Sequence, residues 1–86
     1  MRQTMDEEVS VSMIFNHRTK EAVPKKVQWQ GKVYDISKIG LHHTYRAGRT
    51  LMHVFSVITD TLFFRLELNT DNLHWSVKEI SDGLPE

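Results

Sequence analysis

Hydrophobic and polar residues alternate with a period of two along the second part of the chain, from Leu51 to Ile80. Residues 59–61 and 71–72 are mostly polar and divide this stretch into three segments. Alternating segments rich in β-branched and aromatic side chains, separated by Asp, Asn and Thr, are typical of β-strands joined by tight turns. The pattern therefore predicts a meander of three antiparallel strands, which we expect to supply most of the core.

Two-residue turns at positions 60–61 and 71–72 fix the register of these three strands. Such turns place His53 opposite Leu68, and Leu68 opposite Trp75, so that the apolar side chains share one face. A slip of one residue would scatter them over both faces. The other face is mostly polar, but we expect it to end in an apolar tip formed by Ile58, Phe63 and Ile80.

Residues 9–16 also alternate and predict a first strand, which a polar turn at residues 16–20 would end. The acidic residues before this strand show no period, and we expect residues 1–8 to be a flexible N-terminus. Residues 81–86 are rich in turn-forming residues and predict a C-terminal tail. These boundaries leave a single β domain over residues 9–80.

A hairpin is predicted for residues 25–39. A type II′ turn at Gly31–Lys32, with glycine at the first central position, places Trp29 opposite Tyr34 on one face. The following segment 42–49, HHTYRAGR, shows no apolar alternation. We interpret it as the main loop, which connects the hairpin to the meander.

Together these patterns predict an all-β fold with about six antiparallel strands. A small meander-type sheet would curl into an open barrel or half-barrel. A chain of 86 residues buries roughly 60–65% of the surface that its unfolded form exposes, which is enough for one thin core.

The composition excludes several classes of protein. The chain has no cysteine, so a secreted disulfide scaffold and a thiolate metal site are both excluded. No apolar run approaches the roughly 20 residues of a membrane span, and residues 1–10 lack the apolar stretch of a signal peptide. We therefore expect a cytoplasmic protein that does not enter a membrane.

Charge is unevenly distributed, although the chain as a whole is neutral. Residues 18–49 contain eight basic and two acidic residues, whereas residues 50–86 contain two basic and six acidic ones. The basic segment favours contact with an anionic partner. The alternative is that the two parts neutralise each other within the fold, because runs of charge usually mark solvated faces.

The candidate binding residues lie in this basic segment. Arginine offers bidentate donors for phosphate, and tyrosine and histidine rings stack on bases. We therefore expect contact with nucleic acid or another anion through His42, His43, Tyr45, Arg46, Arg49, Lys25, Lys26 and Lys32. Two alternatives remain open. The loop is an ordinary polar connection whose arginines pair with acidic residues, or the lysines protect edge strands from pairing.

The five histidines do not predict a metal site. Their spacing matches no ligand signature, and the adjacent His42 and His43 point in opposite directions on an extended chain. His53 lies on the apolar face, where a hydrogen-bonded core residue is commoner than a ligand. The one acid–base set would be His42 or His43 beside Arg46 and Arg49. The sequence thus predicts no catalytic residue, no metal ion and no cofactor.

Trp29, Gly31 and Tyr34 form the motif W-x-G-x-x-Y, and the meander ends with L-x-W at Leu73–Trp75. With these features, residues 24–80 resemble a group of short, uncharacterised bacterial β-domain proteins. The resemblance implies an all-β fold and a bacterial, intracellular setting. It assigns no catalytic or binding residue, because the motif belongs to a strand–turn–strand unit.

Two functions follow as hypotheses. The first is a small intracellular binding module that contacts nucleic acid or another anionic partner through residues 18–49. The alternative is a structural or protein-interaction module without catalytic activity. Because a sheet this small has a thin core and exposed edges, such a module would form a homodimer through an edge strand or through the tip of Ile58, Phe63 and Ile80.

Overall fold

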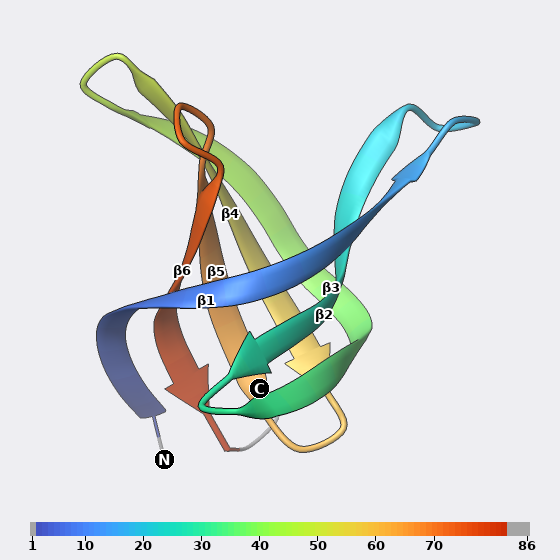
Figure 1. The fold of residues 1–86 in the computed structure, drawn as a ribbon, viewed down its shortest axis with the longest axis vertical. Helices are drawn as coiled ribbons and strands as arrows, with labels where there is room; N and C mark the ends of the chain where they lie inside the picture. The colour runs from blue at the N-terminus through green and yellow to red at the C-terminus, as the bar shows by residue number, and fades with distance from the viewer. Residues whose placement is uncertain (1, 83–86) are drawn as a thin grey trace.

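The computed structural model describes residues 2–82, and these residues form six antiparallel strands and no helix. The strands are β1 (Arg2–Asn16), β2 (Glu21–Trp29), β3 (Lys32–Ala47), β4 (Thr50–Thr59), β5 (Phe63–Asn69) and β6 (His74–Ser81). Each strand pairs with the next, and β1 also pairs with β6, so that the sheet closes into a barrel (Figure 1). The predicted all-β fold of about six antiparallel strands in a curled meander is confirmed.

The predicted registers of β4, β5 and β6 are confirmed. His53 lies opposite Leu68 and Phe55 lies opposite Leu66. Leu68 in turn lies opposite Trp75. The alternation of apolar residues specified these pairings because only this register collects them on the inner face.

The inner faces of the strands meet in one core. Phe64 packs at its centre, where the rings of Trp29 and Tyr34 contact it edge to face with centroids 5.9 and 5.2 Å away. These two aromatic residues are partly buried and pack against the core. Its buried members are Val27, Phe55, Val57, Phe64, Leu66, Trp75, Val77 and Ile80.

The expected apolar tip on the outer face is wrong for Ile80. A bulge in β6 pairs Arg65 with Glu79 but Leu66 with Val77, so one additional residue separates the two pairs. Because a bulge moves the following side chain to the other face, Ile80 enters the core. Phe63 is 9% exposed, so it too offers little surface to a partner.

The predicted turn between β2 and β3 lies one residue too late. Gln30 and Gly31 both have positive φ angles, 51° and 76°, which is the geometry of a type I′ hairpin turn. Val27 therefore lies opposite Tyr34, in the position expected for Trp29. The residue opposite Tyr34 is thus two positions earlier than expected. Because two residues is the period of a strand, the same side chains face the core as predicted.

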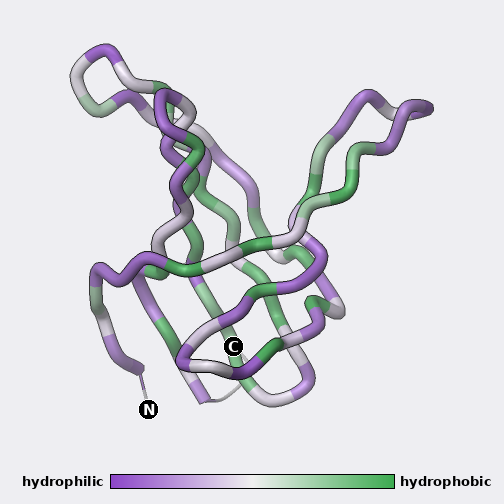
Figure 2. Tube along the Cα trace, in the orientation of Figure 1, coloured by the Kyte–Doolittle hydropathy of each residue, from purple (hydrophilic) through white to green (hydrophobic). Residues whose placement is uncertain are grey.

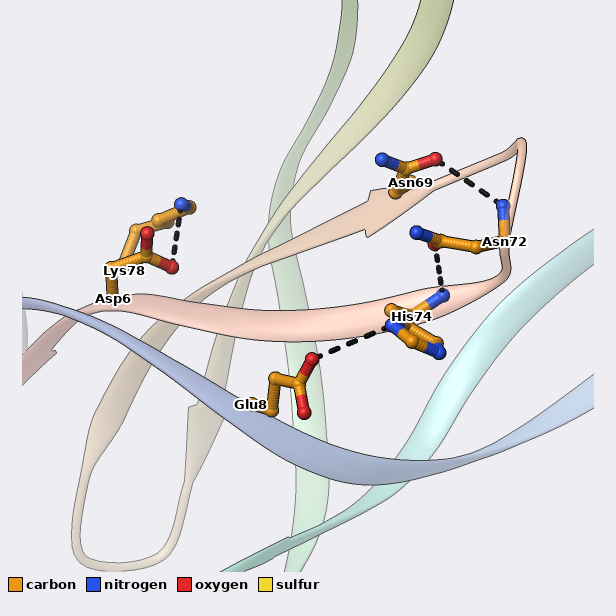
Figure 3. Close-up of polar contacts among 6 residues, drawn as sticks. All are labelled: Asp6, Glu8, Asn69, Asn72, His74 and Lys78. Carbon is orange, nitrogen blue, oxygen red and sulfur yellow. Dashed lines mark hydrogen bonds and ion pairs between the residues drawn. The ribbon is translucent and has the colours of Figure 1, made fainter.

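The acidic N-terminal segment, expected to be a flexible N-terminus over residues 1–8, is β-strand from Arg2 onward. Two polar contacts join it to β6: Asp6 Oδ1 lies 2.9 Å from Lys78 Nζ, and Glu8 Oε1 lies 3.4 Å from His74 Nδ1 (Figure 3). The expected domain therefore begins earlier than residue 9. Of the expected C-terminal tail, Ser81 ends β6, and residues 83–86 lie outside the described part of the chain.

The segment HHTYRAGR is not the predicted loop. Residues 42–47 belong to β3 and pair with residues 50–55 of β4. The connection is only the two-residue turn Gly48–Arg49, in which the positive φ of Gly48, 63°, suits a tight hairpin. No apolar alternation marks this strand because it extends beyond the core and is exposed on both faces.

The core position of Leu66 gives a direct test of the fold. Leu66→Ala should lower the free energy of unfolding by about 2–5 kcal/mol, because the residue is 0% exposed and its truncation leaves a cavity. Leu41→Ala is the matched control, since Leu41 is 56% exposed and should cost under about 0.5 kcal/mol. Urea unfolding followed by circular dichroism measures both, and equal losses would contradict the described core.

Candidate binding cleft

The barrel is closed at one end and split at the other. The pairing of β2 with β3 is confined to Lys26–Trp29 and Lys32–Asp35, and the pairing of β1 with β6 ends at Val9. Beyond these points the β1–β2 hairpin, residues 10–25, leaves the barrel as a two-stranded arm. Figure 1 shows this arm diverging from the tips of the β3–β4 and β5–β6 hairpins.

A cleft of about 630 Å³ lies between the arm and the inner face of the other strands. In Figure 2 the tips of the hairpins are hydrophilic, while hydrophobic stretches follow them toward the barrel. The cleft is apolar over most of its surface, with two imidazoles, a lysine and a glutamate among its polar groups. Its lining residues are Met13, Lys20, Glu21, Ala22, Val23, Ile39, His42, His53, Phe55, Leu68 and Thr70.

Two histidines on neighbouring strands form a hydrogen-bonded pair in this cleft. His42 Nε2 and His53 Nδ1 are 2.8 Å apart. The register explains the contact, because His42 lies opposite Phe55 on β4 and His53 precedes Phe55 by two residues on the same face. The His42 ring stacks on the Phe55 ring, with centroids 4.1 Å apart and an angle of 7° between the planes.

The surroundings of His42 favour its neutral form. Partial burial of the imidazole lowers the pKa of His42 below its ordinary value of 6.5, and the positive charges that His53 and His43 would carry lower it further. The negative charge of Glu21 acts in the opposite direction and is the smallest of these effects. The pair therefore holds a neutral His42 near neutral pH and is a hydrogen-bonding group inside an apolar site.

The structure separates the predicted loop residues onto two faces of the β3–β4 hairpin. His42 and Arg46 share the cleft face, since they are four residues apart on one strand. His43 and Tyr45 lie on the outer face, where the Tyr45 hydroxyl donates a hydrogen bond of 2.6 Å to Glu67 Oε1. This hydrogen bond is the main reason that the pKa of Tyr45 is raised above its ordinary value of 10.

The predicted lysines do not join the arginines in one site. Lys26 lies 3.6 Å from Asp35, and Lys32 lies over the Tyr34 ring, 5.5 Å from its centroid. Both residues belong to the paired β2–β3 segment at the closed end of the barrel (Figure 1). Lys25 precedes that segment on β2 and is exposed. Arg46 and Arg49 are at the opposite end, in the β3–β4 hairpin.

Arg46 and Arg49 are free of the acidic residues with which they were alternatively expected to pair. Within residues 2–82, neither has a carboxylate within 4 Å, and Arg46 Nη1 instead donates to the backbone oxygen of Arg49 at 3.4 Å. Glu79 of the acidic part pairs with Arg2 and Arg65. Arg18, Lys20, Lys25 and Lys38 likewise lack ion pairs in this part of the chain.

Sequence reasoning did not find the cleft or the arm that forms one of its walls. Lys20 and Arg18 lie within the basic segment, but the pattern gave no reason to single them out. Among residues 2–82, no group of three or more His, Asp or Glu side chains could hold a metal ion. The same residues include no helix long and apolar enough to cross a lipid bilayer.

Comparison with known proteins identifies no relative. No protein-family model, curated protein or solved structure matches this chain. The resemblance carried by Trp29, Gly31 and Tyr34 stays a prediction.

The lowered pKa of His42 predicts a loss of stability on acidification. Below about pH 6.5 the unfolded chain binds a proton at this residue that the folded chain does not. The free energy of unfolding therefore decreases as the pH decreases. The decrease ends below the folded-state pKa of His42. Urea unfolding between about pH 7.5 and about pH 5.5 should show it, and His42→Gln should reduce the slope.

The matched control for this measurement is His43→Gln, which removes the neighbouring imidazole from the outer face. It should leave most of the pH dependence in place. A nuclear magnetic resonance titration of His42 with a midpoint at or above its ordinary pKa would contradict the described pair.

Proposed function

We propose that this protein is a binding module for single-stranded nucleic acid, which it contacts at the open end of the split barrel. One observation supports the proposal most strongly. The cations of the arm tip and of the β3–β4 hairpin have no acidic partner within residues 2–82, whereas carboxylates elsewhere pair with Arg2, Arg65 and Lys78.

These free cations stand on both sides of the cleft. Arg18 and Lys20 occupy the β1–β2 turn, and Arg46 and Arg49 occupy the end of the β3–β4 hairpin. Both tips project from the same end of the barrel (Figure 1). A strand that crosses this end would meet positive charge at each tip. Guanidinium groups suit phosphate oxygens in particular, because they donate two parallel hydrogen bonds.

The cleft between the tips favours a single strand over a duplex. Its walls are largely apolar and include the stacked rings of His42 and Phe55. Unpaired bases stack on aromatic side chains, whereas bases in a duplex already stack on one another and are closed to such contact. Cations that follow the backbone beside an aromatic surface are the usual arrangement of proteins that bind single strands.

Removal of the two arginines of the β3–β4 hairpin should weaken binding and its salt dependence. For Arg46→Gln with Arg49→Gln, the slope of the logarithm of affinity against the logarithm of salt concentration should decrease by about 1.4. Each phosphate contact contributes about 0.7 in a single-stranded complex. Fluorescence anisotropy of a labelled oligonucleotide at several salt concentrations measures this slope.

The control for charge is Lys26→Gln with Lys78→Gln. This variant removes the same number of positive charges, but both lysines already pair with exposed aspartates. It should bind nearly as the parent protein does. Equal losses of affinity in the two double variants would show that net charge alone, and not the open end, governs binding. No binding by the parent protein at low salt would refute the proposal.

A second candidate function is self-association through the free edge of β1. Residues 10–16 of β1 pair with β2 on one side, and within the described chain no strand pairs with them on the other. The stretch Ser10–Phe15 contains no charged residue, although charged side chains commonly protect exposed strand edges. Met13, Ile14 and Phe15 are all exposed in it. A second copy of the chain fits this edge by antiparallel pairing of the two β1 strands.

Ile14→Lys tests this candidate, because a charge on the edge opposes pairing. The parent protein should have the mass of a dimer in light scattering at high concentration, and the variant the mass of a monomer. Leu41→Lys, at an equally exposed leucine of β3, should leave the dimer intact. A parent protein that stays monomeric at all concentrations would contradict this candidate.

A further inference from the structure

We infer that the cleft is a pocket for one neutral, planar heterocycle that carries a hydrogen-bond donor or acceptor on its edge. The inference rests on the proposed function for its natural ligand, which is an unstacked base of the bound strand. Its physical basis is the His42–His53 pair, which the phosphate contacts do not use.

The hydrogen bond within the pair couples the tautomers of the two rings. A neutral imidazole has one N–H and one free lone pair. The bond between His42 Nε2 and His53 Nδ1 uses one N–H and one lone pair. His42 Nδ1 and His53 Nε2 therefore remain available for a hydrogen bond to a ligand. If His42 donates, its Nδ1 is an acceptor and His53 Nε2 is a donor; if His53 donates, the two roles are exchanged. The neutral pair therefore always retains one donor and one acceptor.

This property suits the edge of a nucleobase. Bases present both donors and acceptors on their edges. The two free nitrogens lie at opposite outer ends of the pair, so a single base meets one of them, and the two tautomers let that nitrogen either donate to the base or accept from it. A site of this kind distinguishes a base from a purely apolar ring, but it discriminates weakly among bases.

The shape and polarity of the cleft point to the same class of ligand. One face of the His42 ring covers Phe55, and His42 is exposed, so its other face is open to a further planar ring. Met13, Ile39 and Leu68 make the walls apolar. A volume of about 630 Å³ is within the range of roughly 300–1,000 Å³ for small-molecule sites.

The charges that line the cleft do not favour an ionic ligand. Lys20 and Glu21 form no ion pair with each other but give the lining no net charge, and the surroundings of His42 favour its neutral form. A carboxylate or phosphate inserted beside the histidines would lose its hydration in a lining that has no net positive charge. The phosphates of a strand would instead stay at the tips, with only the base entering the cleft.

The test compares a thymidine oligonucleotide with an abasic oligonucleotide of the same length and charge. In fluorescence anisotropy the abasic strand should bind about fivefold to hundredfold more weakly, which is the range of one stacked base. His42→Ala should remove this difference. His43→Ala, on the outer face of the same strand, should retain it. Ala22→Trp, which fills the cleft from the arm without a change of charge, should remove it as well.

The outcomes separate the pocket from the proposed function. Equal affinity for the two strands would overturn the pocket and leave the phosphate contacts in place. If neither strand binds, free thymidine is added to isotope-labelled protein and nuclear magnetic resonance shifts are recorded. Shifts at His42 and His53 that Ala22→Trp abolishes would support the pocket while refuting the strand-binding function. An absence of shifts would overturn both.

Discussion

Strand β1 exchanges one partner for another along its length, and the rest of the structure depends on this exchange. Its first half, to Val9, pairs with β6 and closes the barrel, while its second half, from Ser10, pairs with β2 alone. If β1 paired with β6 along its whole length, the barrel would have no gap between these two strands. Because it leaves β6, the β1–β2 hairpin becomes a separate arm, and the cleft lies beneath that arm.

This division gives the two ends of the molecule different roles. The closed end holds the core around Phe64 and Leu66, which are fully buried. The open end holds exposed strands and the cleft. His42 marks the transition between the two, because its ring lies on the core residue Phe55 and also lines the cleft. Within residues 2–82 the barrel thus presents a cleft without any loop longer than a few residues.

The sequence predicted the meander well because burial on one face enforces a strict period of two. That period specified the pairs His53–Leu68 and Leu68–Trp75. The same reasoning failed where a strand has no buried face. Residues 42–47 extend β3 beyond the core, and acidic residues of β1 contact Lys78 and His74 of β6, so neither segment shows apolar alternation. The alternation of apolar and polar residues also gives no sign of the bulge before Ile80.

The candidate site was only partly predictable for a related reason. The basic segment was visible from composition, and His42, Arg46 and Arg49 do lie at the open end. The sequence did not predict that this segment is a strand. Because side chains on a strand alternate between its two faces, His43 and Tyr45 point away from the cleft. The arm wall, with Met13 and Lys20, depends on where β1 leaves β6, and no local pattern encodes that point.

We propose that the open end of the barrel is the surface that binds a single strand. Titration of an unlabelled thymidine oligonucleotide into isotope-labelled protein, followed by nuclear magnetic resonance, tests it most directly. Amide shifts should be concentrated at residues 17–20, at residues 46–49 and at the two paired histidines, and they should leave the turns at residues 30–31 and 60–61 unchanged. Shifts confined to those closed-end turns, or no shifts at low salt, would contradict it.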